Sequence, residues 1–234
     1  CAFCGKTFKG RTKDHVPPQG LFGENPNYNL ITVPACIQCN NSTSKDDEYF
    51  KLLAMDCDAS ENPVAQQVND STLRAMAHPK KAGLASLIFS SMRPVEVTTR
   101  SGLFVREAMA IRIDMERISR TVEKTVRGLF YRIRRHPLPD SHAVGCYATH
   151  ILGRAVPRTD GQQLYTKLLP AIQAKPVHQI GPSGIFRYRY LEMEGDPNSM
   201  VFVLGFFGKF DYLAVTCRKA VFAPKRWVDN GPSV

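Results

Sequence analysis

The longest regular pattern of apolar positions lies in the middle of the chain. After Asp114, apolar residues recur every three or four positions up to about residue 134, which is the period of one helix face. Asp114 can cap this helix, because a short acidic side chain accepts hydrogen bonds from the free N–H groups of the first turn. We therefore predict a helix over residues 114–134 with one buried stripe, formed by Met115, Ile118, Val122, Val126, Leu129 and Ile133.

Further helices are predicted on both sides of this one. Ser44 is predicted to cap a helix, because it is followed by acidic residues, which favour the positive end of a helix dipole. The dipole is sufficient to explain these acids, although they could also be interpreted as metal ligands. Residues 64–77 and 82–92 have helical character, and a helix over 162–174 should end before Pro176.

Strand-like runs occur in two groups. Residues 95–99 and 103–113 alternate between apolar and polar positions and are separated by a turn at Ser101-Gly102, which predicts a hairpin. Near the C-terminus we expect three more strands, over residues 185–193, 199–207 and 210–217. The last two should be joined by a two-residue turn at Gly208-Lys209, with glycine in the first turn position.

Two Cys-x-x-Cys pairs enclose the first 39 residues of the chain, and they comprise Cys1 with Cys4 and Cys36 with Cys39. Each two-residue spacer lets a tight turn direct both sulfurs at one ion, and four thiolates satisfy tetrahedral zinc. No coordination position would remain open to water. We therefore predict a structural zinc site that stabilises a segment too small to bury a core of its own.

The other cysteines, Cys57, Cys146 and Cys217, are widely separated and lie in apolar settings. This distribution argues against a disulfide framework and for a reducing compartment, so we expect a cytoplasmic protein in which they are buried small hydrophobes. The sequence contains no apolar run of about 20 residues, so no membrane span is expected.

The chain has a formal net charge of +10, which favours a polyanionic partner, and nucleic acid ahead of a membrane surface. The alternative is that the charge serves solubility alone. Arg132, Arg134 and Arg135 cluster at the end of the central predicted helix and are candidates for phosphate contact. The alternative is that they complete a helix C-terminus, where cations interact favourably with the dipole.

The segment between the cysteine pairs carries a second pattern. Taken in order, the stretches within residues 1 to about 55 resemble the HNH endonuclease family, whose ββα-metal fold is often held by zinc. The matching stretches are Cys1-Ala2-Phe3-Cys4, Asp14-His15-Val16-Pro17-Pro18, Asn29-Leu30-Ile31-Thr32-Val33-Pro34-Ala35-Cys36, and Cys39-Asn40-Asn41 leading to Lys45.

The resemblance implies a phosphodiester-cleaving site. It makes His15 the general base, and it makes Asp14 and Asn40 ligands of a catalytic Mg²⁺ or Mn²⁺ ion. Such chemistry needs an activated water and neutralisation of charge in the transition state, which an imidazole and a divalent ion can supply. Lys13 and Lys45, which lie close to these residues in the sequence, are expected to contact nucleic acid.

Two positions of the family pattern remain open. A further asparagine usually steadies the loop that carries the base, and Asn29 is the natural candidate. Asn29 lies seven residues before Cys36, which is longer than the commonest spacing, so Asn27 or Thr32 are alternatives. Asn41 is the alternative metal ligand if the register differs by one residue.

These observations predict an α+β protein. Residues 1–55 should form a zinc-bound HNH nuclease module, 56–80 a connector, and 81–234 a mixed α/β domain with C-terminal antiparallel strands that selects or holds the substrate. The expected function is metal-dependent cleavage of DNA, double-stranded by default, in restriction, defence or mobile-element functions. The alternatives are a non-catalytic zinc-containing DNA-binding protein and an RNA-cutting nuclease with the same site.

Overall fold

The computed structural model describes residues 1–10, 12–23, 28–56, 62–79, 82–99, 101–149 and 160–220. Over these residues the chain is an α+β protein with six α-helices and three antiparallel sheets, which confirms the predicted fold class. The helices are α1 (Ile37–Ser42), α2 (Ser44–Phe50), α3 (Pro63–Met76), α4 (Ala82–Ser91), α5 (Met115–Arg134) and α7 (Asp160–Gln173).

Two small sheets precede the main one. The first pairs β1 (Lys13–Val16) with β2 (Ile31–Pro34), and α1 follows directly, so the N-terminal part has a ββα order. The second pairs β3 (Met92–Thr98) with β4 (Phe104–Ile111). The main sheet has the order β5-β9-β8-β7-β6. Its strands are β5 (His142–Ala148), β6 (His178–Ile180), β7 (Phe186–Glu192), β8 (Met200–Phe206) and β9 (Phe210–Arg218).

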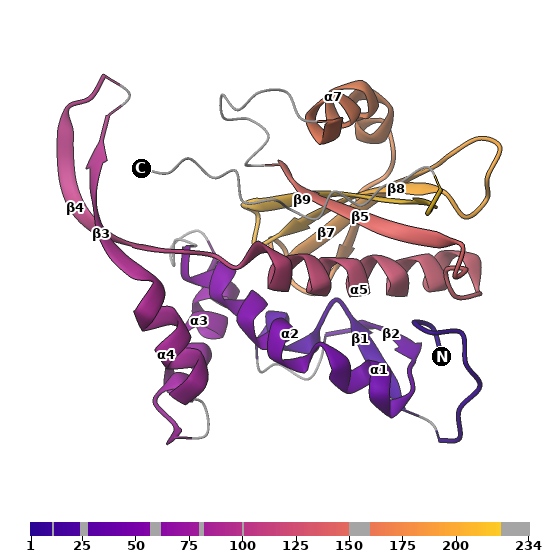
Figure 1. Ribbon diagram of the computed structural model, residues 1–234, viewed down its shortest axis with the longest axis horizontal. Coiled ribbons are helices and arrows are strands. Elements are labelled where there is room, and N and C mark those ends of the chain that lie inside the picture. The colour runs from indigo at the N-terminus through magenta and orange to yellow at the C-terminus, as the bar shows by residue number, and fades with distance from the viewer. Residues whose placement is uncertain are drawn as a thin grey trace.

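Helix α5 is the central element of the molecule. It lies between the five-stranded sheet and the N-terminal β1, β2, α1 and α2, while α7 covers the opposite face of the sheet (Figure 1). The predicted apolar stripe packs toward the core, and its members Ile118, Val122, Val126 and Leu129 are fully buried. The Asp114 side chain accepts hydrogen bonds from the backbone N–H groups of Glu116 and Arg117, as predicted for the cap.

A second face of α5 is also buried, although its residues are polar or small: Thr121, Lys124, Thr125 and Gly128. A Cβ atom at Gly128 would lie 2.4 Å from Cγ2 of Val16 in β1. Glycine destabilises a helix interior by about 1 kcal/mol relative to alanine, so its presence here is explained by the close approach of β1. This second face attaches the N-terminal elements to the rest of the protein.

One cluster of buried apolar side chains joins the N-terminal elements to the main sheet. It includes Val16 and Phe22 from the N-terminal part and Phe202 and Phe206 from β8. The Phe50 and Phe206 rings meet edge to face, with centroids 4.8 Å apart. The segment predicted to be a connector contains α3, and its buried Ala65 and Val68 belong to the same cluster. The core is therefore continuous across the predicted module boundaries.

Two local predictions differ from the structure, and two strands were not predicted. Ser44 is the first residue of α2, and the residue before it, Thr43, takes the N-cap position. The turn between β8 and β9 is centred one residue earlier than predicted. Its residues with positive φ are Phe207 and Gly208, and the Lys209 N–H donates to the Phe206 carbonyl at 3.2 Å. Strands β5 and β6 were not predicted, because β6 has three residues and β5 lacks a strict alternation.

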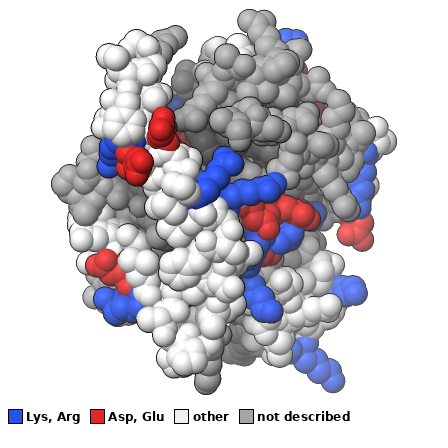
Figure 2. Space-filling model, turned by 60° about the vertical axis from the view of Figure 1, so that its left-hand side comes forward, with Lys and Arg blue, Asp and Glu red and all other residues white. Residues whose placement is uncertain are grey.

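Strands β3 and β4 form the hairpin that the sequence pattern predicted. This hairpin extends away from the body beside α4 (Figure 1). The hairpin exposes apolar side chains that include Phe104 and Met109, and α4 exposes Phe89. Figure 2 turns this side of the molecule forward. On that face the Lys and Arg side chains lie in small groups among Asp and Glu, so the net positive charge does not form one continuous surface there.

The cysteines outside the N-terminal pairs are only partly as predicted. Cys146 in β5 and Cys217 in β9 are half-buried and pack against the apolar clusters. Burial raises the pKa of both thiols, which makes them poor nucleophiles. Cys57 lies outside the described residues. None of the helices that the structure describes has the length and apolar character needed to cross a bilayer.

Candidate metal centre

The four predicted zinc ligands come together in the structure. The Sγ atoms of Cys1, Cys4, Cys36 and Cys39 all lie within 4.8 Å of one another, and those of Cys4 and Cys36 are 4.0 Å apart. Sulfurs bound to zinc at about 2.3 Å in a tetrahedron are separated by about 3.8 Å. The cluster is close to this arrangement and can hold a structural zinc ion.

Local structure explains how distant cysteines meet. The Ala2 N–H donates to the Pro34 carbonyl at 2.7 Å, which ties the N-terminal turn to the end of β2. Cys36 occupies the N-cap of α1, and its backbone N–H donates to the Cys1 sulfur at 3.4 Å. Burial raises the pKa of Cys39 to about 12, whereas its backbone N–H lowers the pKa of Cys36. A shared cation would allow all four thiols to lose their protons together.

Asp14 and Asn40 meet next to this cluster. The terminal amide of Asn40 lies 3.1 and 3.2 Å from the two carboxylate oxygens of Asp14. With its nitrogen turned toward Asp14, as the neighbouring groups favour, the amide donates to both oxygens. With the amide turned over, its oxygen would stand beside the carboxylate, and both could then ligate one hard cation. The predicted pair of oxygen ligands thus converges from β1 and α1.

The side of β1 that carries Asp14 faces α5. Successive side chains of a strand point to opposite faces, so Asp14 and Val16 share one face. Asp14 Oδ2 lies 2.7 Å from Lys124 Nζ, and Val16 lies against Gly128. Lys124 and Gly128 are four residues apart and therefore lie about one turn apart along α5. The distance between Asp14 and Val16 along the strand is close to the length of one helical turn. When Val16 packs on Gly128, Asp14 therefore lies beside Lys124.

Lys124 also belongs to the group of polar side chains around Asp14 and Asn40, and the sequence analysis did not identify it. Its ammonium contacts three oxygens: Asp14 Oδ2, Asp47 Oδ2 at 3.4 Å and the Asn40 carbonyl at 3.4 Å. Its side chain is only 10% exposed. In the sequence Lys124 is one of several basic residues in a helix, and no local signal distinguishes it from them. Only the tertiary structure shows that Lys124 contacts Asp14.

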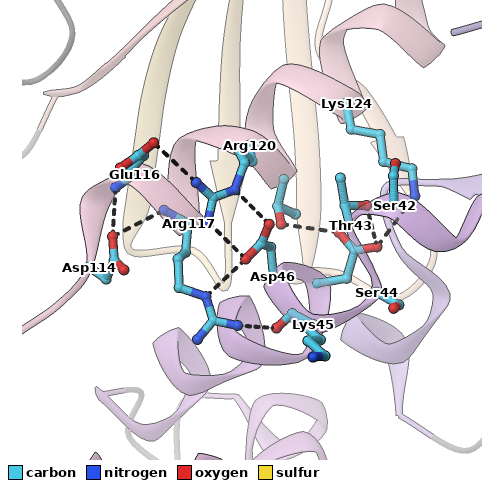
Figure 3. Close-up of polar contacts among 12 residues, drawn as sticks. Ser42, Thr43, Ser44, Lys45, Asp46, Asp114, Glu116, Arg117, Arg120 and Lys124 are labelled. Atoms are coloured by element: carbon cyan, nitrogen blue, oxygen red, sulfur yellow. Dashed lines mark hydrogen bonds and ion pairs between the residues drawn. The ribbon is translucent and has the colours of Figure 1, made fainter. Parts of the chain in front are cut away.

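The acidic residues at the start of α2 bind α5 (Figure 3). Asp46 accepts hydrogen bonds from Arg117 Nε at 2.9 Å and from Arg120 Nε at 2.7 Å. Burial opposes ionisation of Asp46, but the two guanidinium groups outweigh it and lower its pKa. Burial raises the pKa of Asp47, which accepts a hydrogen bond from Thr121 at 3.1 Å. These acids lie in the first turn of α2, as predicted, and they also form its ion pairs to α5.

Removing the two ion pairs of Asp46 should measurably destabilise the protein. We expect Asp46→Ala to lower the free energy of unfolding at pH 7 by about 2–3 kcal/mol, since hydrogen bonds to charged groups contribute about 1.5–3 kcal/mol. Because folding lowers the pKa of Asp46, this stabilisation is present above about pH 4 and is lost as the pH falls through the folded-state pKa. Urea unfolding at several pH values measures both effects.

The matched control is Glu116→Ala. Glu116 pairs with the same Arg120, at 3.3 Å, but its side chain is 78% exposed. An exposed pair of this kind contributes little, so we expect a change within about 0.5 kcal/mol. Equal effects of the two substitutions would contradict the role assigned to Asp46.

His15 lies on the opposite face of β1 from Asp14, together with Lys13. It is half-buried, and Lys13 is exposed. The strand register places Thr32 of β2 directly opposite His15. Asn29 is exposed and precedes β2, whereas Asn27 lies outside the described residues. Asn29 and Thr32 are the two described candidates for the residue that steadies the loop of the base. Of these two, Thr32 is the neighbour of His15 across the sheet.

Two further predicted residues lie on the surface near the start of α2. Asn41, the alternative ligand, is exposed, and its carbonyl accepts a hydrogen bond from the Ser44 hydroxyl at 3.0 Å. Lys45 is also exposed, and its carbonyl accepts from Arg117 Nη2 at 2.7 Å. The geometry therefore brings Asn40, rather than Asn41, to the Asp14 carboxylate.

The predicted basic cluster at the end of α5 is divided by the fold. Arg134 forms an ion pair with Glu192 at 3.1 Å, and its side chain is 20% exposed. Arg132 and Arg135 are exposed. Arg134 lies ten residues beyond Lys124 in sequence, which is about 15 Å along a helix. Two of the three arginines are thus available to a partner, on the helix that also reaches Asp14.

No protein-family model, curated protein or solved structure matches the chain. The site is therefore defined by its own residues. It is a four-cysteine cluster that can hold zinc, and it adjoins a partly buried cluster of Asp14, Asn40, Asp47 and Lys124.

Proposed function

We propose that this chain is a metal-dependent endonuclease of the HNH type that hydrolyses phosphodiester bonds in DNA. The observation that carries the proposal is the convergence of Asp14 and Asn40 beside the four-cysteine cluster, with His15 adjacent to Asp14 on β1. These residues belong to the stretches that resemble the HNH family. Their proximity in space supports the proposed endonuclease more strongly than their order in the sequence does.

The proposed roles follow from the chemistry of each group. Asp14 and Asn40 would hold a Mg²⁺ or Mn²⁺ ion, since both metals prefer oxygen ligands. When bound, the ion would neutralise charge that develops on the phosphate and its leaving oxygen. A neutral imidazole can accept a proton at neutral pH, so His15 would take the proton of the attacking water. The four-cysteine cluster would keep β1, β2 and α1 together.

Nucleic acid is the proposed substrate because the chain has a net charge of +10 and exposed basic side chains at several points. Arg132 and Arg135 at the end of α5, with Lys13 and Lys45 near the cluster, are the proposed phosphate contacts. The part of the chain that contains the five-stranded sheet would select or hold the substrate. Double-stranded DNA remains the default target on the strength of the family resemblance.

Incubation with supercoiled plasmid tests the proposal. The full chain should convert the plasmid to nicked or linear forms when Mg²⁺ or Mn²⁺ is added, and should leave it supercoiled in metal-free buffer. His15→Ala, purified in parallel, controls for contaminating nucleases. Binding without cleavage with either ion would instead support a zinc-containing DNA-binding protein, and cleavage of RNA alone would support an RNA nuclease.

A further inference from the structure

We propose that Lys124 is an internal cation that competes with the divalent ion for Asp14, so that the metal can bind only when the lysine side chain is displaced. This inference rests on the proposed function in taking Asp14 as a metal ligand. It goes beyond that function because Lys124 belongs to α5, outside the part of the chain that resembles the HNH family.

The first support is the coordination of the ammonium. Lys124 Nζ lies 2.7 Å from Asp14 Oδ2, with Asp47 Oδ2 and the Asn40 carbonyl each 3.4 Å away. The Asp14 side chain is 12% exposed and that of Lys124 is 10% exposed. The lysine thus places one positive charge between two mostly buried carboxylates and reduces the repulsion between them.

The second support is that the two cations exclude one another. A Mg²⁺ ion bound to Asp14 Oδ2 would lie about 2.1 Å from the oxygen that the ammonium already contacts, and the other oxygen, Oδ1, lies 3.1 Å from the Asn40 amide. Two like charges within about 4 Å repel strongly in a partly buried setting. Asp14 Oδ2 therefore cannot serve the metal and Lys124 in this arrangement at the same time.

Asp47 provides a second position for the displaced ammonium. Its Oδ2 atom is already 3.4 Å from Lys124 Nζ, and its other oxygen is held by Thr121. The lysine stem is flexible, so a small rotation would bring the ammonium closer to Asp47 and release Asp14. Lys124 would then have two positions, one that closes the metal site and one that opens it.

Titration of the full chain with Mn²⁺ tests this directly, with free Mn²⁺ measured by electron paramagnetic resonance. Lys124→Met removes the charge and keeps the length of the side chain, and we expect it to bind Mn²⁺ at least about tenfold more tightly than the wild type. The matched control is Lys175→Met, which makes the same change in net charge at an exposed position outside the proposed site and should leave the affinity unchanged. The double variant Asp14→Asn/Lys124→Met should lose the gain.

Equal Mn²⁺ affinities of Lys124→Met and the wild type, with zinc content retained, would overturn the inference. A second measurement on the wild type guards against a variant that fails to fold. Mn²⁺ should increase acetylation of Lys124 by an amine-reactive reagent relative to that of the exposed Lys175, as measured by mass spectrometry. Acetylation of Lys124 that does not respond to Mn²⁺ would also overturn it.

These outcomes are separable from those of the plasmid assay. A protein that cleaves plasmid but shows no effect of Lys124 on Mn²⁺ binding would keep its proposed function and lose this inference. A protein that binds Mn²⁺ more tightly after Lys124→Met, yet never cleaves nucleic acid, would keep the competition at Asp14 and lose the nuclease function.

Discussion

Replacing His15 with alanine should abolish plasmid cleavage while leaving the fold, the zinc content and DNA binding intact. Loss of a general base typically slows a reaction by about 10²–10⁴, which is enough to silence a plasmid assay. The side chain lies on the face of β1 opposite Asp14, so its removal should not disturb the contacts to α5. Single-turnover cleavage of a labelled duplex measures the rate, and gel-shift titration measures binding.

Variants of the proposed ligands provide the contrast. Asp14→Asn and Asn40→Ala should also be inactive, but through lost affinity for the divalent ion. Raising the Mn²⁺ concentration should therefore restore part of their activity and none of the activity of His15→Ala. If His15→Ala cleaves as fast as the wild type, the assignment of the base is wrong, although the class of enzyme could survive.

Replacing Cys36 with serine should remove zinc and unfold the N-terminal elements. A structural zinc site contributes on the order of 10 kcal/mol to the folding of a small module. Cys36 also anchors α1, since it occupies the helix N-cap. The damage should spread along α5, because the buried cluster that includes Val16 and Val33 continues to the main sheet. Elemental analysis, circular dichroism and hydrogen exchange measure these changes.

Cys217→Ser is the matched control for this substitution. Cys217 is half-buried in β9, on the sheet that lies beyond α5 from the four-cysteine cluster. We expect the variant to retain one zinc per chain and a cooperative thermal transition. A Cys36→Ser protein that keeps stoichiometric zinc, or a wild type that is folded and active without zinc, would contradict the structural role of the cluster.

Local patterns carried much of what could be predicted from the sequence. The apolar period after Asp114 and the cap at that residue identified α5, because both depend on residues within a few positions of one another. The hairpin of β3 and β4 was predicted for the same reason. The spacing of the cysteines predicted a shared metal site, since two short turns that carry thiols have few other uses.

Predictions failed where the decisive partner is distant in sequence. The second buried face of α5 carries Lys124 and Gly128, and a polar helix face is usually exposed to solvent, so its burial could not be inferred from periodicity. Strand β5 is held in the sheet by pairing with β9 rather than by its own alternation. The turn after β8 was displaced because Phe207 adopts a positive φ, which is unusual for a bulky residue.

The sequence by itself determined most of the helices and strands, the four cysteines and the candidate residues Asp14, His15 and Asn40, since these are properties of single residues and of short spacings. Only the tertiary structure decided what surrounds them. It brings Lys124 to Asp14 because β1 docks on α5 at Gly128, where the absence of a side chain admits Val16. Such a contact depends on the packing of two elements far apart in the chain, and the local pattern of neither element encodes it.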